Sequence, residues 1–262
     1  MDLKLNDKKA LVLSASKGIG KGLALALSKE GCEVIICSSN LDNLTLAKKE
    51  IEENSNNEIF TYQMDLSSEE SVNKACKKIH DEHQGVDILI TNSPGPKPVS
   101  AMNLKNSDLN IAMQVNFFSV VQLCNHFLPK MIKNKFGRII NLSSTTAREP
   151  EAGMILSNVS RAAVISYSKT LSKELSKYGI TFNSILTGGV LTDRTHNLLK
   201  MEAEVQGISI EKIYKNASDN IPAGYIPTPE EFAYSIVYLC SPLSSNINGV
   251  NLPIDGGLMN AL

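Results

Sequence analysis

The stretch SASKGIG, residues 14–20, follows a short apolar run and precedes a segment of helical period. Glycines at a strand-to-helix turn let the backbone approach a pyrophosphate, whose charge is then met by the free N–H groups and positive dipole of the helix N-terminus. Alone the pattern is weak, because Gly18 and Gly20 could serve only the packing of helix on strand. We interpret the stretch as a phosphate-binding turn that comprises Ser14, Ser16, Lys17, Gly18, Ile19 and Gly20.

The next apolar run ends in CSSN, residues 37–40, and the first acidic side chain after it is Asp42. A site for NAD usually places a carboxylate at the end of this run, where it accepts a hydrogen bond from the ribose 2′-hydroxyl. The polar groups of Ser38, Ser39 and Asn40, with Lys17 nearby in the phosphate-binding turn, suit a 2′-phosphate better than a carboxylate would. The sequence therefore favours NADP over NAD.

Short runs rich in β-branched residues alternate with longer segments of helical period along the whole chain. The runs occupy residues 9–13, 33–37, 59–63, 86–91, 138–142, 181–186 and 250–254. Strands separated by helices predict an α/β fold of the Rossmann type, a doubly wound sheet of about seven parallel strands with helices on both faces. No linker, repeat or low-complexity block divides the sequence, so we expect one domain over residues 1–262.

Two stretches interrupt this alternation, residues 93–100 and residues 187–229, and each follows a predicted strand directly. In an open α/β sheet, ligands bind in the crevice beyond the carboxyl ends of the strands. We therefore expect both stretches to border a site, with residues 187–229 as a substrate lid, hereafter the lid segment. The alternative is that they are only long surface connections.

Composition limits the partners that the protein can have. The 26 Lys and Arg nearly balance the 27 Asp and Glu, so the net charge of −1 indicates neither nucleic acid nor an anionic membrane as a partner and favours a small-molecule substrate. The first residues contain too short an apolar run for a signal or a membrane span, which predicts a cytoplasmic protein. Five scattered cysteines and four histidines suggest neither a disulfide framework nor a metal site.

Further motifs follow the phosphate-binding turn in order: MDL at 64–66, TNSPG at 91–95, VN at 115–116, RIINLSS at 138–144, SRAAV at 160–164, TG at 187–188 with Thr192, and DGG at 255–257. With them the sequence resembles the short-chain dehydrogenase/reductase family over essentially its full length, in particular its 3-oxoacyl-acyl-carrier-protein reductases and sugar dehydrogenases. The resemblance implies that Asn116 is the structural asparagine of the active site. It also implies dinucleotide contacts from Asp65, Leu66, Asn92, Gly188 and Thr192.

The sequence departs from the family at the residues that perform the chemistry. The family's catalytic serine matches Ser144, and its Tyr-x-x-x-Lys pair should begin thirteen residues later, where this chain has Ser157 and Arg161. The i, i+4 spacing would still place both side chains on one helix face toward the site. In typical members the tyrosine exchanges the proton, while the lysine lowers the tyrosine pKa and binds the nicotinamide ribose. An aliphatic hydroxyl is a far weaker acid than a phenol, and an arginine cannot relay a proton.

The phosphate-binding turn also departs from the family pattern. Ser14 stands in the place of the family's first glycine, and a serine held at positive φ would cost on the order of 1 kcal/mol, although its hydroxyl could bond a phosphate oxygen. Thr187 replaces the usual proline before Gly188, which loosens the turn that contacts the nicotinamide carboxamide. Both changes are expected to weaken dinucleotide binding without excluding it.

Three hypotheses follow for the function. The first is an NADP-linked oxidoreductase for a carbonyl or secondary alcohol, in which Ser144 positions the substrate oxygen, Ser157 or water supplies the proton, and Arg161 holds the nicotinamide ribose. The second, favoured by the missing tyrosine and lysine, is a non-catalytic protein that binds a dinucleotide or another small ligand. The third is a lyase or isomerase, with Asp193 or His196 of the lid segment as a proton donor or base.

Two expectations concern surfaces outside the active site. Tyr167 lies ten residues beyond Ser157, which turns it away from the same helix face, so we expect a packing or interface residue there. Long helices are expected at residues 104–131 and 155–178, and they match the helices through which members of the resembled family pair. We therefore expect a homo-oligomer, a tetramer in particular.

Overall fold

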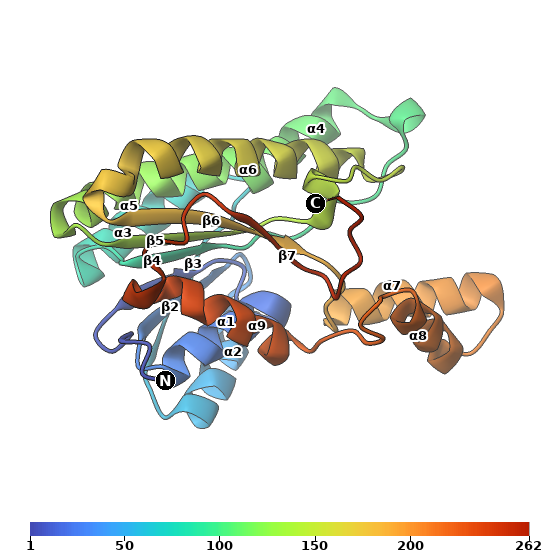
Figure 1. The fold of residues 1–262 in the computed structure, drawn as a ribbon, viewed down its shortest axis with the longest axis horizontal. Helices are drawn as coiled ribbons and strands as arrows, with labels where there is room; N and C mark the ends of the chain where they lie inside the picture. Colours follow the sequence, from blue (N-terminus) through green and yellow to red (C-terminus); the bar gives the residue numbers. More distant parts are fainter. Residues whose placement is uncertain (262) are drawn as a thin grey trace.

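The computed structural model describes residues 1–261; Leu262, the last residue of the predicted domain, lies outside the described residues. Within that range the chain forms a parallel seven-stranded sheet with the order β3-β2-β1-β4-β5-β6-β7 (Figure 1). The predicted doubly wound sheet is confirmed, with each strand within two residues of its expected bounds. The strands are β1 (Lys9–Val12), β2 (Glu33–Ser38), β3 (Ile59–Gln63), β4 (Ile88–Thr91), β5 (Gly137–Leu142), β6 (Ile180–Thr187) and β7 (Asn251–Ile254).

Helices cover both faces of the sheet (Figure 1). One face carries α1 (Gly18–Lys29), α2 (Leu41–Ser55) and α9 (Pro229–Cys240), and the other carries α3 (Glu69–His83), α5 (Ser119–Asn134) and α6 (Ile155–Leu175). Successive strand residues serve opposite faces: Ala10 and Val12 belong to the first core, and Leu11 and Leu13 to the second. Burial on both faces explains why the strands read as continuous apolar runs in the sequence.

The helix expected at residues 104–131 is divided into α4 (Asn106–Met113), a π-helical turn (Gln114–Phe118) and α5. The cause is local: the buried side chain of Asn116 donates from Nδ2 to the carbonyl of Ala112 at 2.9 Å, and the Ser119 hydroxyl donates to the carbonyl of Val115 at 2.8 Å. Side-chain donors at these carbonyls compete with the regular helical bonds, and wider turns of this kind are frequent at functional sites.

The other long helix is α6, which a single 3₁₀ turn extends over Ser176–Tyr178, as expected for residues 155–178. Further 3₁₀ turns lie at Ala101–Asn103, Thr145–Ala147 and Pro242–Ser244. The lid segment contains α7 (Asp193–Gln206) and α8 (Ile210–Asp219), which extend from the sheet beyond the carboxyl ends of β6 and β7 (Figure 1). Among residues 1–261, no helix combines the length and the apolar character needed to cross a membrane.

Candidate active site

A cavity of about 560 Å³ lies beyond the carboxyl ends of the strands, where the parallel-sheet rule places a ligand. The loops after β1 to β6 all contribute to its wall. Sixteen of the predicted site residues line it: Ser14, Ser16, Lys17, Gly18, Ile19, Ser38, Ser39, Asn40, Asp65, Leu66, Asn92, Ser144, Ser157, Arg161, Gly188 and Thr192. Two others, Gly20 and Asn116, lie behind the wall.

The predicted phosphate-binding turn has a backbone that few residues other than glycine adopt. Ser14 has φ +47° and Gly18 has φ +57°, so the serine does occupy a left-handed conformation. Gly20 is required for packing, because a Cβ there would lie 2.6 Å from the carbonyl oxygen of Ser14. Lys17 is the N-cap of α1 and its side chain makes no capping hydrogen bond, so the first N–H groups of α1 are left for an anion.

At the end of β2 the cavity wall carries hydroxyl and amide groups. The hydroxyl of Ser16 donates to that of Ser38 at 3.0 Å, and Oδ1 of Asn40 caps α2 by accepting from Asn43 N at 2.8 Å. Asp42 does not line the cavity, and the acid that lines it after β3 is Asp65, whose Oδ1 accepts from both the backbone N–H and the hydroxyl of Ser67. The tip of β2 itself therefore presents no negative charge to a bound nucleotide.

Three hydroxyl groups meet at the opposite end of the cavity. Ser144 follows β5, Thr146 lies in the 3₁₀ turn after it, and Ser157 is in the first turn of α6. Oγ of Ser144 accepts from the backbone N–H and the hydroxyl of Thr146 at 3.2 Å and 3.1 Å. Oγ1 of Thr146 is also 3.2 Å from Oγ of Ser157. Sequence reasoning did not identify Thr146, whose only signal is its closeness to Ser144 in the chain.

Arg161 lies one turn after Ser157 on α6 and is 8% exposed. Its Nη1 donates to the carbonyl of Leu142 and its Nη2 to the carbonyl of Ser93 at 3.4 Å, while Nε is buried without a partner among the described residues. Burial, and then the charge of Arg194, lower the pKa of Arg161 to about 10. The guanidinium thus remains charged at neutral pH, and it has more N–H groups than the two hydrogen bonds it makes.

Asn116 is 3% exposed, and the π-helical turn holds it behind the loop that follows β4. Its Oδ1 accepts from the hydroxyl of Ser93 at 2.7 Å, and Ser93 lines the cavity. The side chain therefore fixes the cavity wall from behind.

Arg194, at the start of α7, joins the two stretches expected to border the site. It donates from Nη1 and Nη2 to the carbonyls of Gly95 and Pro96, the second bond at 3.2 Å. A Cβ on Gly95 would lie 2.7 Å from Arg194 Nη1, so the absence of a side chain makes room for the guanidinium. Nothing in the sequence distinguishes Arg194 from an ordinary surface arginine, because its contacts are 98 and 99 residues away.

The structure separates the other candidates for proton transfer. Asp193 lines the cavity, whereas His196 does not and instead contacts the Tyr214 hydroxyl through Nδ1 at 2.7 Å. Tyr167 also lies outside the cavity and packs edge-on against Phe117, with ring centroids 5.9 Å apart. Burial raises its pKa above the usual value for tyrosine. Among residues 1–261, no three His, Cys, Asp or Glu side chains gather as metal ligands would.

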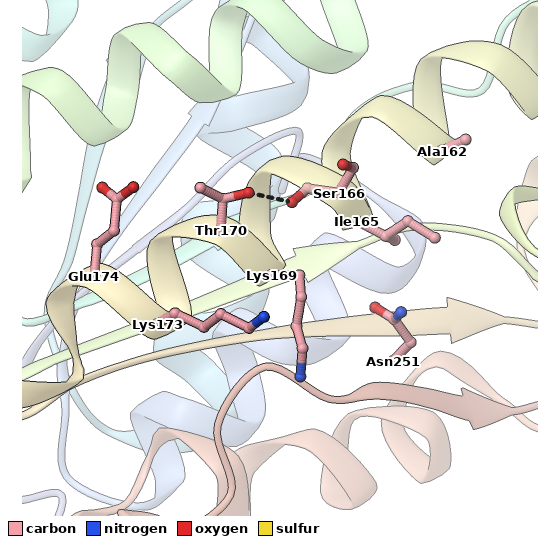
Figure 2. A pocket seen from close by; sticks show the side chains of 8 residues that line it. All are labelled: Ala162, Ile165, Ser166, Lys169, Thr170, Lys173, Glu174 and Asn251. Carbon is pink, nitrogen blue, oxygen red and sulfur yellow. Dashed lines mark hydrogen bonds between the residues drawn. The ribbon is translucent and has the colours of Figure 1, made fainter.

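A second, open cavity of about 710 Å³ lies on the outer side of α6 beside β7 (Figure 2). None of the predicted site residues line it. The amine of Lys169 donates to the carbonyl of Gly249 at 2.9 Å, and Thr170 donates to the carbonyl of Ser166. These contacts, with the exposed Lys173 and Glu174 one turn further along α6, are those of a solvated helix face, and we assign no ligand to this cavity.

Comparison with known proteins agrees with the fold and the motifs. A family model described as short chain dehydrogenase matches residues 8–203. The 3-oxoacyl-[acyl-carrier-protein] reductase FabG of Aquifex aeolicus (strain VF5) is 30% identical over 258 residues, which cover 98% of this chain and 100% of that protein. The NADPH-dependent reductase BacG of Bacillus subtilis (strain 168) is 29% identical over 259 residues, again 98% and 100% of the two chains.

A solved structure is similar over the whole length of this chain. L-sorbose reductase from Gluconobacter frateurii, complexed with NADPH and L-sorbose, matches with a TM-score of 0.96 and 26% identity, covering 100% of both chains. The chain belongs to the short-chain dehydrogenase family.

Proposed function

We propose that the protein is an NADP-linked oxidoreductase that interconverts a carbonyl compound and a secondary alcohol. The observation that carries the proposal is that one cavity extends from the phosphate-binding turn to Ser144, Ser157 and Arg161. A dinucleotide whose phosphates bind at one end of this cavity could therefore reach, at the other end, a substrate held by these three side chains. Similarity to FabG over nearly the full length supports a 3-oxoacyl-reductase-like substrate, and similarity to BacG supports NADP.

The residues at the nucleotide end fit NADP. The free N–H groups of α1 can bind the pyrophosphate, and Lys17 with the polar tip at residues 38–40 can bind the 2′-phosphate without a competing carboxylate. Arg161 lines the cavity and has N–H groups beyond its two bonds to backbone carbonyls, so it can donate to the nicotinamide ribose. Contacts to the adenine and nicotinamide parts are assigned to Asp65, Leu66, Asn92, Gly188 and Thr192. When bound, the reduced cofactor supplies the hydride.

At the substrate end, the chain's own groups orient the substrate and handle the proton. Ser144 positions the substrate oxygen, Ser157 or a water supplies the proton, and Asn116 orders a water behind the cavity wall. Because Arg161 stays protonated at neutral pH, it contributes charge and hydrogen bonds but no proton relay. The proposed chemistry therefore proceeds with a weaker acid than a phenol.

One observation favours a second candidate, a protein that binds the dinucleotide without turnover. The cavity wall contains no tyrosine or histidine among the described residues, and its lysine, Lys17, lies at the phosphate end. A fluorescence titration with NADPH, followed by assays with 3-oxoacyl thioesters and sugars, separates the two. Tight binding of NADPH without oxidation by any of these substrates would favour the binding protein.

Cofactor choice is tested at Ser39. We expect wild-type protein to bind NADPH more tightly than NADH, and Ser39→Asp to reverse the order, because a carboxylate repels the 2′-phosphate and accepts from a free 2′-hydroxyl. Ser39→Ala is the matched control, since it removes the hydroxyl without adding charge and should keep the NADPH preference. Tighter binding of NADH by the wild-type protein would overturn the assignment of NADP.

A further inference from the structure

The three hydroxyls at the substrate end form a hydrogen-bonded chain with a defined direction. Each hydroxyl has one proton to donate and two lone pairs with which to accept. Ser144 Oγ accepts twice from Thr146, from its backbone N–H and from its hydroxyl. Both lone pairs of Ser144 are then engaged, and its own proton is free. Since Ser144 lines the cavity, that proton has the cavity in which to find a partner.

Counting donors and acceptors in the same way determines where the hydroxyl protons of Thr146 and Ser157 point. The hydroxyl proton of Thr146 is engaged in the hydrogen bond to Ser144. In its contact with Ser157, Thr146 can therefore only accept, and Ser157 must be the donor. The proton of Ser157 is then turned away from the cavity, and only its lone pairs remain for a ligand. Thr146 itself is 5% exposed and does not line the cavity.

We propose that Thr146 is a positioning residue that makes Ser144, rather than Ser157, the proton donor to the substrate. The inference rests on the proposed carbonyl reduction and refines it. The sequence predicts Ser157 and Arg161 as the catalytic pair. In the inferred arrangement three hydroxyls form a relay instead, and Ser157 is the member furthest from the substrate oxygen along it.

The proton balance of the reduction is as follows. With the hydride supplied to the carbonyl carbon by a dihydronicotinamide, the π electron pair of the C=O bond moves onto the oxygen. That oxygen takes the proton of Ser144, Ser144 takes that of Thr146, and Thr146 takes that of Ser157. Ser157 is reprotonated by a water that enters the cavity and leaves as hydroxide. The net change is the addition of one hydride and one solvent proton to the carbonyl group.

The test uses four variants and ethyl acetoacetate as the probe ketone. Thr146→Val removes the hydroxyl and keeps the side-chain shape, whereas Thr146→Ser keeps the hydroxyl. We expect Ser144→Ala to lower kcat by about 10²-fold, the usual scale of general acid catalysis, and Thr146→Val by about 10-fold, with KM for the ketone little changed. The kcat of Thr146→Ser should stay within about threefold of the wild type. Ser157→Ala should lower kcat less than Ser144→Ala does. NADPH affinity and melting temperature serve as controls for folding.

Two further measurements separate a positioning role from a structural one. Because Thr146 acts through Ser144, adding Thr146→Val to Ser144→Ala should cause no further loss, whereas independent effects would multiply. Infrared spectra of ethyl acetoacetate labelled with ¹³C at the keto carbon, bound beside oxidised NADP, report the hydrogen bond without turnover. The keto band should move to higher frequency in Ser144→Ala and Thr146→Val and stay in place in Ser157→Ala.

The outcomes distinguish this inference from the proposed function. If wild-type protein reduces no carbonyl compound and shows no band for a bound ketone, the proposed function fails and the relay with it. If the wild type is active but Thr146→Val matches it, or Ser157→Ala shifts the band and Ser144→Ala does not, the proposed function stands and the relay is wrong.

Discussion

At the scale of single residues, the proposed exchange of the family's tyrosine and lysine for Ser157 and Arg161 would change proton chemistry more than charge. Arg161 keeps a cation at the centre of the site, because its lowered pKa of about 10 still lies well above neutrality. Its two bonds to the carbonyls of Leu142 and Ser93 also hold the strand β5 and the loop after β4 together. What the proposed exchange would remove is an acid strong enough to protonate an alkoxide readily at neutral pH.

Restoring the acid should therefore raise the rate. We predict that Ser157→Tyr combined with Arg161→Lys increases NADPH-dependent reduction of an activated ketone by about 10²-fold or more. Each single change should do less, because the phenol needs the neighbouring ammonium to lower its pKa and the lysine alone has no phenol to act on. The measurement is kcat for ethyl acetoacetate in the wild type, both single variants and the double variant. A folded, NADPH-binding double variant no faster than wild type would refute the account of a weakened acid.

At the scale of elements, the turn between β1 and α1 combines strain with the binding role proposed for it. Ser14 takes φ +47°, a conformation that costs a residue with a Cβ on the order of 1 kcal/mol and that glycine adopts freely. The carbonyl of Ser14 accepts from the amide of Asn92 at 3.3 Å, and it lies so near Gly20 that a Cβ there would be 2.6 Å from it; these neighbours restrict the turn to the strained conformation.

We predict that Ser14→Gly raises the free energy of unfolding by up to about 1 kcal/mol, since relief of the strain exceeds the entropy that glycine adds to the unfolded chain. Urea denaturation of the protein without nucleotide measures the effect. Ser16→Gly is the control, because Ser16 is not at positive φ and the same change there should destabilise. Equal losses from both substitutions would show that Ser14 carries no strain that glycine can relieve.

The elements also show what the sequence can and cannot predict. Strands could be placed because burial on both faces makes them continuous apolar runs, and helices because each buries an apolar face of fixed period. The π-helical turn could not, since it depends on whether the amide of Asn116 or a backbone N–H reaches the carbonyl of Ala112. At the cavity, the ordered motifs predicted residues at strand ends that the structure brings together. They missed Thr146 and Arg194, whose roles depend on contacts that only the folded chain creates.

At the scale of the whole molecule, the surface around β7 and α6 has features of an interface. The strand β7 ends the sheet, and its Leu252 and Pro253 are exposed. Val159 on α6 is 45% exposed, and Phe118, at the junction of the π-helical turn and α5, is 48% exposed. An edge strand with apolar side chains is prone to pair with another chain unless it is covered. Two isologous contacts between subunits, one at β7 and one at α6, would bury these exposed apolar side chains.

We predict that the protein is a homotetramer of four 28.5 kDa chains in which β7 and the outer sides of α5 and α6 meet their symmetry equivalents. Light scattering at micromolar concentration should give about four times the mass of one chain. Leu252→Glu places a charge at the edge strand and should reduce the mass without loss of the fold, because a charge buried between subunits without a partner is costly. Leu198→Glu, at a 48% exposed position on α7 in the lid segment, adds the same charge away from these faces and should leave the tetramer intact. A 28.5 kDa particle from the wild type would show that these apolar groups face solvent and that the site is complete within one chain.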